Sequence, residues 1–381
     1  MQSICSMKES WEIKKLGDCC NIQTGKLDAN ARVENGKYPF YTCDSQPYRI
    51  DTYAFDAEAI LISGNGSLVG HVNYYNGKFN AYQRTYVLTE FSSFYIPYLI
   101  HFLKQYIRPY IMKNKKGGCI PYITLPILKN FLIPCPPLPE QESIVAELDC
   151  LSGVIEKQKR QLKELDNLAQ SIFYTTFGDP ISNNFGWKNR RLGEIVNSNM
   201  IGLTRSGSEQ DASYEYLYFK MNNIGNEGGV DWSKTTRVNA CAQEVEKYTL
   251  KEGDFLFNTR NSFELVGKTC IYPRIDGEVC LFNNNIMRID FKKEINVTYM
   301  AYLFQDKYIK NQLDRIKKGT TSVWAIYYKD LEKIDILVPD IALQEEFASK
   351  VAAIEKQKVT IKQSIEETET LFNSRMDYYF N

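Results

Sequence analysis

The sequence predicts an α+β protein in which two strand-rich domains are joined by two long helices that pair as an antiparallel coiled coil, in a pseudo-two-fold internal repeat. Two observations predict this fold. Short motifs recur in the same order in both halves of the chain. Each half also ends in a helical pattern with apolar residues three or four positions apart. The 381 residues are enough for two or three domains, each with its own core.

The repeat consists of four pairs of matching motifs. The first is a W-x4-L-G frame, the second is Leu-Val-Gly, the third is Lys-Lys-Gly, and the fourth is a proline-containing segment followed by Gln-Glu. The pairs are 11–17 with 187–193, 68–70 with 265–267, 115–117 with 317–319, and 132–142 with 337–345. Four matches in one order indicate that the chain contains one module twice.

Each helical pattern covers about 38 residues, 140–177 and 343–380, and would be roughly 55 Å long. Neither domain can cover so long an apolar stripe, so we expect the two helices to pack against each other. Two unrelated helices, each capping its own domain, remain an alternative. Gln158, Lys358 and Thr368 interrupt the stripes. The predicted helix–helix residues are Leu148, Leu151, Ile155, Leu162, Leu165 and Ile172 in the first helix and Val351, Ile354, Ile361, Ile365 and Phe372 in the second.

The motifs divide the chain into a first domain (1–137), a first helix (138–178), a second domain (179–340) and a second helix (341–381). Gly178-Asp179-Pro180 ends the first helix, because glycine suits a helix C-terminus and proline cannot continue it. Turn signals predict hairpins at Asn35-Gly36, Asn76-Gly77 and Asp276-Gly277. Short helices are expected at 96–104 and 297–316.

Composition excludes several classes of protein. Lysine plus arginine and aspartate plus glutamate are both 46, so the neutral chain is not a wholesale polyanion binder. The ten cysteines are scattered without a C-x-x-C pair, which argues against a zinc site and fits a reducing compartment. The chain has only two histidines, which argues against histidine-based catalysis, and it has no phosphate-binding loop, which argues against ATP binding. No secretory signal or membrane-spanning run is present, so we expect a cytoplasmic protein with no membrane role.

The repeated frame resembles the specificity subunit of Type I restriction–modification enzymes. The similarity covers essentially the whole chain and is most specific in the phrases 138–148, 172–180 and 253–269. It implies two target-recognition domains, each reading half of a bipartite DNA sequence, with the paired helices as a ruler. It also implies a non-catalytic subunit that binds double-stranded DNA, two adenine-N6 methyltransferase subunits and restriction subunits. No cofactor is expected on this chain, while S-adenosylmethionine, ATP and Mg²⁺ are expected on the partner subunits.

Candidate DNA contacts are basic and polar loop residues, because such side chains bind phosphates and base edges. The run 258–262 is the first choice for base contacts, and the basic loops suit phosphates. Solvated charge runs or a polar hairpin tip would also explain these segments. A coiled-coil scaffold with two protein-binding domains is the alternative function, which net neutrality slightly favours. The candidates are Lys26, Asn65, Arg84, Thr85, Lys113, Lys115, Lys116, Arg205, Asn258, Thr259, Arg260, Asn261, Ser262, Lys317, Lys318, Thr320 and Thr321.

Overall fold

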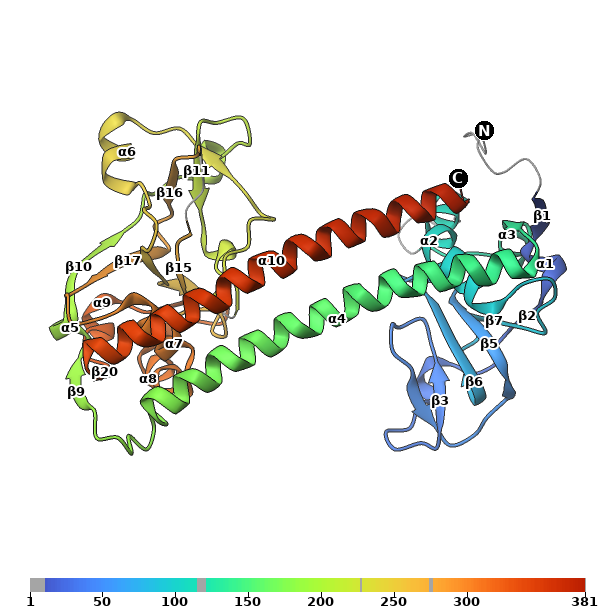
Figure 1. Ribbon diagram of the computed structural model, residues 1–381, viewed down its shortest axis with the longest axis horizontal. Coiled ribbons are helices and arrows are strands. Elements are labelled where there is room, and N and C mark those ends of the chain that lie inside the picture. The colour runs from blue at the N-terminus through green and yellow to red at the C-terminus, as the bar shows by residue number, and fades with distance from the viewer. Residues whose placement is uncertain (1–10, 115–120, 227, 274–276, 381) are drawn as a thin grey trace. The chain divides into compact units, whose positions relative to one another are not determined.

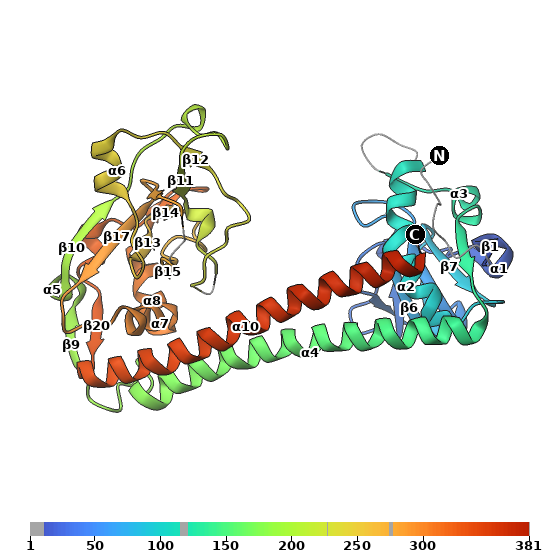
Figure 2. The same cartoon turned by 45° about the horizontal axis from the view of Figure 1, so that its top comes forward.

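The computed structural model describes residues 11–114, 121–226, 228–273 and 277–380. The chain divides into two compact units, Met1–Lys159 with Gln363–Asn381, and Arg160–Lys362. Each unit contains one strand-rich domain and a part of each long helix (Figures 1 and 2). The strand-rich part of the first unit is called the first domain below, and that of the second unit the second domain.

The first domain is built on a six-stranded sheet in the order β2-β7-β5-β6-β3-β4. Alternate residues of the strands enter a large core on one face and a smaller one on the other. Helix α2 (Ile96–Asn114) supplies six residues to the larger core. The strands are β2 (Asn21–Thr24), β3 (Tyr38–Tyr41), β4 (Tyr48–Ile50), β5 (Phe55–Ser63), β6 (Val72–Ala81) and β7 (Thr85–Thr89), and all neighbours are antiparallel except β3 and β6.

The second domain has a four-stranded sheet, β10-β17-β13-β15, and a three-stranded sheet, β12-β11-β16. Helices α7 (Val297–Gln305) and α8 (Lys307–Ile316) share one core with the larger sheet. A small sheet joins β14 (Arg260–Asn261), β19 (Trp324–Ala325) and β18 (Lys318–Gly319). The other strands are β10 (Val196–Ile201), β11 (Tyr216–Phe219), β12 (Arg237–Val238), β13 (Phe255–Asn258), β15 (Thr269–Ile271), β16 (Cys280–Phe282) and β17 (Ile286–Phe291), and α6 spans Ala242–Tyr248.

The W-x4-L-G and proline motifs form the same structure in both domains. In the first, β1 (Glu12–Lys15) pairs with β8 (Leu132–Cys135), and α1 (Leu16–Cys19) and α3 (Leu125–Lys129) pack beside them. In the second, β9 (Lys188–Arg191) pairs with β20 (Asp335–Val338), next to α5 (Leu192–Ile195) and α9 (Tyr328–Leu331). The repeated motifs therefore mark the join between each domain and the following long helix.

Helices α4 (Leu138–Phe177) and α10 (Ile341–Phe380) are 40 residues each and pair antiparallel. In the first unit, Gln158 of α4 donates from Nε2 to Ser364 Oγ of α10 at 2.7 Å. In the second unit, Lys358 Nζ lies 2.7 Å from Asp166 Oδ1. No predicted helix–helix residue is exposed. Leu148, Val351, Ile354 and Ile365 are buried, and Leu151, Ile155, Leu162, Leu165, Ile172, Ile361 and Phe372 are partly buried.

The ends of the long helices also enter the cores of the domains. Leu148 of α4 and both Met376 and Phe380 of α10 belong to the core of the first domain. Phe173 of α4 and Phe347 of α10 belong to the core of the second, with their ring centroids 5.7 Å apart. Each apolar stripe is therefore covered partly by the other helix and partly by a domain.

A buried glutamine fixes the start of each long helix to its domain. The Gln141 amide donates to Pro136 O at 2.8 Å and to Ser93 O at 3.0 Å, and its Oε1 accepts from Tyr95 N at 2.7 Å. In the second unit, Gln344 contacts Pro339 O at 2.8 Å, Glu294 O at 3.2 Å and Asn296 N at 2.9 Å. Both side chains are fully buried, so these bonds satisfy groups that water cannot reach.

Three local predictions need correction. Asn76-Gly77 is not a turn, because both residues lie inside β6 and pair with Glu58 and Ala57 of β5. Helix α2 continues ten residues beyond the predicted end at residue 104. The segment 297–316 forms two helices, because Asp306 caps the second by accepting from Tyr308 N at 2.7 Å. Asn35-Gly36 lies just before β3, and Asp276 is outside the described residues.

Candidate nucleic-acid interface

Four segments of the first domain lie side by side at the ends of its central strands, and we call them the loop edge. They are residues 25–27, 63–70, 82–85 and 121–123. Main-chain hydrogen bonds connect them in order: Gln83 N to Leu27 O (2.9 Å), Gly64 N to Arg84 O (2.8 Å) and Ile123 N to Gly64 O (3.0 Å). These main-chain bonds hold the four segments in place, and the side chains of the loops project from them.

The second domain builds the same loop edge from residues 202–205, 258–267, 283–286 and 324–326. The equivalent bonds are Asn284 N to Leu203 O (3.0 Å), Thr259 N to Asn285 O (2.8 Å) and Ile326 N to Thr259 O (2.9 Å). The segments of the two edges therefore correspond one to one.

The Leu-Val-Gly motif closes one loop of each edge. Gly70 N donates to Ser63 O at 2.8 Å, and Gly267 N donates to Asn258 O at 2.9 Å. Both glycines have positive φ, +83° and +92°, a conformation in which other residues are strained. Gly70 also approaches α2 closely, since a Cβ there would lie 3.1 Å from Arg108 Cα. The motif is therefore explained by backbone geometry.

On the first loop edge, Lys26 and Arg84 are exposed and Asn65 is partly buried. Lys113 is exposed on the last turn of α2, while Lys115 and Lys116 lie outside the described residues. Thr85 is buried, so its prediction as a DNA contact is corrected: a side chain inside the core cannot reach a base.

On the second loop edge, Arg260 is exposed, and Asn261 and Ser262 are partly buried. Asn258 and Thr259 are buried, which corrects their assignment as base contacts. The Asn258 amide donates to Arg260 O at 3.1 Å and Asn285 O at 3.0 Å, and its Oδ1 accepts from Asn261 Nδ2 at 3.0 Å. Asn258 therefore supports the loop from beneath.

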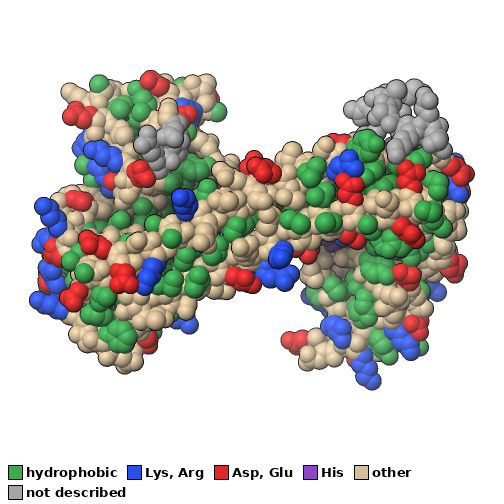
Figure 3. Space-filling model, in the orientation of Figure 1, with side chains coloured by type: hydrophobic (Ala, Val, Ile, Leu, Met, Phe, Trp, Pro, Cys, Tyr) green, Lys and Arg blue, Asp and Glu red, His purple; other side chains and the backbone are tan. Residues whose placement is uncertain are grey.

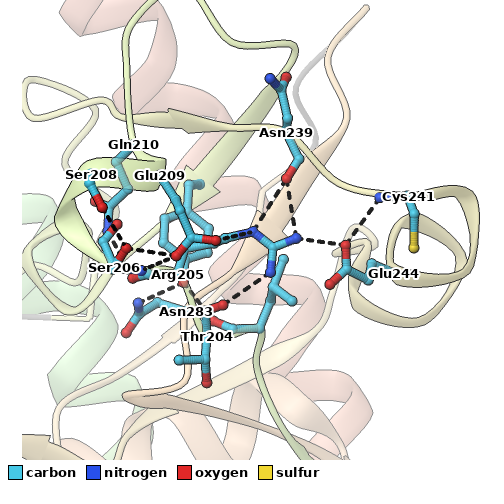
Figure 4. A network of polar contacts seen from close by, with 12 residues as sticks. Thr204, Arg205, Ser206, Ser208, Glu209, Gln210, Asn239, Cys241, Glu244 and Asn283 are labelled. Atoms are coloured by element: carbon cyan, nitrogen blue, oxygen red, sulfur yellow. Dashed lines mark hydrogen bonds and ion pairs between the residues drawn. The ribbon is translucent and has the colours of Figure 1, made fainter.

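The prediction of Arg205 as a DNA contact is also corrected, because its guanidinium is bound by partners within the second domain (Figure 4). Its Nη2 lies 2.6 Å from Glu244 Oε2 at the start of α6, its Nη1 donates to Thr204 O at 3.0 Å, and Nη2 also donates to Asn239 O at 3.2 Å. The side chain is only 15% exposed. The hydrogen bond with Glu244 raises the pKa of Arg205 and lowers the pKa of Glu244. The Arg205 side chain thus links the 204–210 segment to α6.

The Lys-Lys-Gly loop of the second domain is less free than its sequence indicates. The Lys317 side chain is 6% exposed and lies 2.7 Å from Asp314, with its ammonium over the Phe263 ring at 4.3 Å. Lys318 is exposed but pairs with Asp330 at 2.6 Å, and this hydrogen bond lowers the pKa of that carboxyl. Thr320 and Thr321 are exposed. Its contacts with Asp314 and Phe263 hold the Lys317 ammonium within the domain, which corrects its prediction as a DNA contact.

Sequence reasoning missed Asn284 and Asn285 in the second domain, which correspond to Gln83 and Arg84 in the first. They occupy the same turn of the two loop edges, as the matching hydrogen bonds show. The run Asn283-Asn284-Asn285 is a polar cluster after an apolar strand, which was the available signal. On the face in Figure 3, basic and acidic side chains are interspersed.

The described residues form neither a candidate membrane span nor a candidate metal cluster. None of their helices is both long and apolar enough to cross a membrane. Residues 11–114, 121–226, 228–273 and 277–380 contain no group of three histidine, cysteine, aspartate or glutamate side chains placed to hold a metal ion.

Comparison with known proteins identifies the repeat. A family model described as the Type I restriction modification DNA specificity domain matches residues 8–167 and again 184–369. The Type I restriction enzyme EcoDI specificity subunit of Escherichia coli is 39% identical over 163 residues, which are 42% of this chain and 35% of that protein. The EcoKI specificity subunit of Escherichia coli strain K12 is 22% identical over 361 residues, 91% of this chain and 76% of that protein.

Solved structures share the fold. The crystal structure of a Type-I restriction-modification system S subunit from M. genitalium has a TM-score of 0.61 and 16% identity, covering 99% of this chain and 98% of that one. A chain from a structural study of the complex assembly and conformational transition of the type I R-M system has a TM-score of 0.55, with 19% identity and 99% of both chains covered. Since the family model matches most of the sequence in two copies, this chain belongs to the family of Type I restriction–modification specificity subunits.

Proposed function

We propose that this chain is the sequence-specific DNA-binding subunit of a Type I restriction–modification complex. Each domain reads one half of a bipartite target with its loop edge, and α4 and α10 set the spacing of the half-sites. The duplicated loop edge carries the proposal, since the same main-chain bonds present Arg84 in one domain and Asn285 in the other. Frameworks that match while their side chains differ are expected to read different half-sites.

The proposed partners are two adenine-N6 methyltransferase subunits and restriction subunits. The chain itself has no catalytic role in this proposal, and S-adenosylmethionine, ATP and Mg²⁺ bind to the partners in the cytoplasm. The balance of 46 basic and 46 acidic residues supports shared binding. Phosphate contacts depend on positive charge, so partner subunits supply part of the charge around the duplex.

The test is co-expression of the full chain with its methyltransferase subunit in a host without adenine methylation. Sequencing of modified DNA is expected to find N6-methyladenine in one two-part motif, and neither protein alone should produce it. Arg84→Ala should weaken methylation or relax the first half-site, because Arg84 is exposed on the loop edge. Arg315→Ala is the matched control, since Arg315 is an exposed arginine on α8, outside the edge.

Two results would contradict the proposal. One is a complex that assembles but methylates no two-part motif. The other is unchanged methylation by Arg84→Ala and also by Arg260→Ala, which removes the exposed arginine of the second loop edge. Assembly with a protein partner and no retention of duplex DNA would instead favour the protein-binding scaffold.

A further inference from the structure

We propose that Asn285 reads an adenine in the half-site of the second domain, at the position where Arg84 reads a guanine for the first domain. This inference rests on the proposed function and assigns one base-reading position in each loop edge. The sequence motifs do not mark this specificity-determining pair, because the turns 82–85 and 283–286 share no residue type.

The correspondence between the two positions comes from their main-chain hydrogen bonds. The carbonyl of Arg84 accepts from Gly64 N and that of Asn285 accepts from Thr259 N, both at 2.8 Å. The preceding residue donates to Leu27 O in one domain and to Leu203 O in the other. The following residue donates back across the turn in both, from Thr85 N to Tyr82 O at 2.8 Å and from Ile286 N to Asn283 O at 2.9 Å.

Within the asparagine run, the three side chains have different environments. Asn283 is buried, donates to the Tyr218 hydroxyl at 2.8 Å and accepts from Asn285 N at 2.8 Å. It therefore braces the turn. Asn284 and Asn285 are partly exposed, and neither side-chain amide is hydrogen-bonded to another described residue. Two unsatisfied amides on a fixed turn are available to a ligand, and a fixed backbone lowers the entropy lost on binding.

The chemistry of the two positions differs in a way that base recognition uses. An asparagine amide offers one donor and one acceptor, which match N7 and N6 of adenine in the major groove. An arginine fork offers two donors, which match O6 and N7 of guanine. Exchange of the two side chains should therefore exchange the preferred base, while the backbone already accommodates either residue.

The experiment uses the full chain co-expressed with its methyltransferase subunit, with the motif determined by sequencing of modified DNA. Asn285→Arg is expected to change one position of the second half-site from A·T to G·C by roughly fivefold or more, the lower range of a bidentate contact. Arg84→Asn should make the reverse change in the first half-site. Asn285→Ala should relax that one position. Asn189→Arg, an exposed residue of β9 outside the edge, should keep the wild-type motif.

The inference is overturned if Asn285→Arg and Asn285→Ala both methylate the wild-type motif at the wild-type level. Loss of methylation at every site by Asn285→Ala in a complex that still assembles also overturns it, because a reader of one base should leave related sites in use. Absence of any two-part motif with the wild-type chain would instead be a failure of the proposed function.

Discussion

Replacing Gln141 by leucine should open the join between the first domain and α4. Leucine keeps the approximate size of the side chain but removes its hydrogen bonds to Pro136 O, Ser93 O and Tyr95 N. A buried polar group left without a partner costs about 1–3 kcal/mol. The Tyr95 amide and Pro136 O both lose the glutamine, while Ser93 O keeps its contact with Cys135 Sγ. Since leucine regains some apolar burial, we expect a net loss of about 2–4 kcal/mol.

Urea denaturation of the full chain measures this loss, and hydrogen exchange locates it. Amide exchange should rise around residue 95 in Gln141→Leu and around residue 296 in Gln344→Leu, because each glutamine serves only its own domain. Gln161→Leu and Gln357→Leu are matched controls on the same helices, since both glutamines are exposed. Their effect should stay within about 0.5 kcal/mol. If Gln141→Leu behaved like Gln161→Leu in both assays, the buried amide would have no structural role.

Three further predictions concern the helices and the second domain. One heptad inserted in α4 near Leu162, with another in α10 near Ile361, should lengthen the preferred DNA spacer by about three base pairs, since seven helical residues add about 10 Å. If sequencing of modified DNA found an unchanged spacer with an active variant, the helices would not set the spacing of the half-sites. The bond with Arg205 lowers the pKa of Glu244, so Glu244 stabilises the fold above its usual pKa of 4.5 and this stability is lost as pH falls through the lowered value. Glu244→Gln should therefore lose less melting temperature on acidification than the parent. An equal loss would contradict this. Replacing Gln158 by leucine together with Ser364 by alanine should raise the free energy of unfolding by about 1 kcal/mol, because both partners of the Gln158–Ser364 hydrogen bond are removed along with Gln158 Oε1, which is buried without a hydrogen-bond partner among the described residues. A less stable double variant in urea denaturation would refute this.

The long helices were predictable because their signals are local and redundant. Heptad spacing, the prolines before each helix and Gly178 placed the ends within two or three residues of Leu138–Phe177 and Ile341–Phe380. The antiparallel pairing followed from the repeat. The prediction of a hairpin turn at Asn76-Gly77 was wrong, because the continuous pairing of β5 with β6 outweighed a turn signal of two residues.

The loop edge was predictable only as a set of segments. Arg260 and Arg84 lie on it as exposed side chains, but Arg205 is held by Glu244, 39 residues away, and Asn258 by Asn285. Whether a polar loop residue is free or occupied depends on such distant partners, which composition does not reveal. The correspondence between Asn285 and Arg84 likewise becomes visible only when the hydrogen bonds of the two domains are compared.

The packing of α10 into the first domain has a consequence for the order of folding during synthesis. Met376 and Phe380 complete a core whose other buried members come from residues 16–148, and the Tyr106 hydroxyl bonds to Met376 O across 270 positions. The second unit, Arg160–Lys362, is continuous in sequence and can close before residues 363–380 leave the ribosome. Domains usually fold in the order of their synthesis. Here the domain that is made first completes its core only when the last turns of α10 are available, so the apolar surface that Met376 and Phe380 cover stays exposed until then.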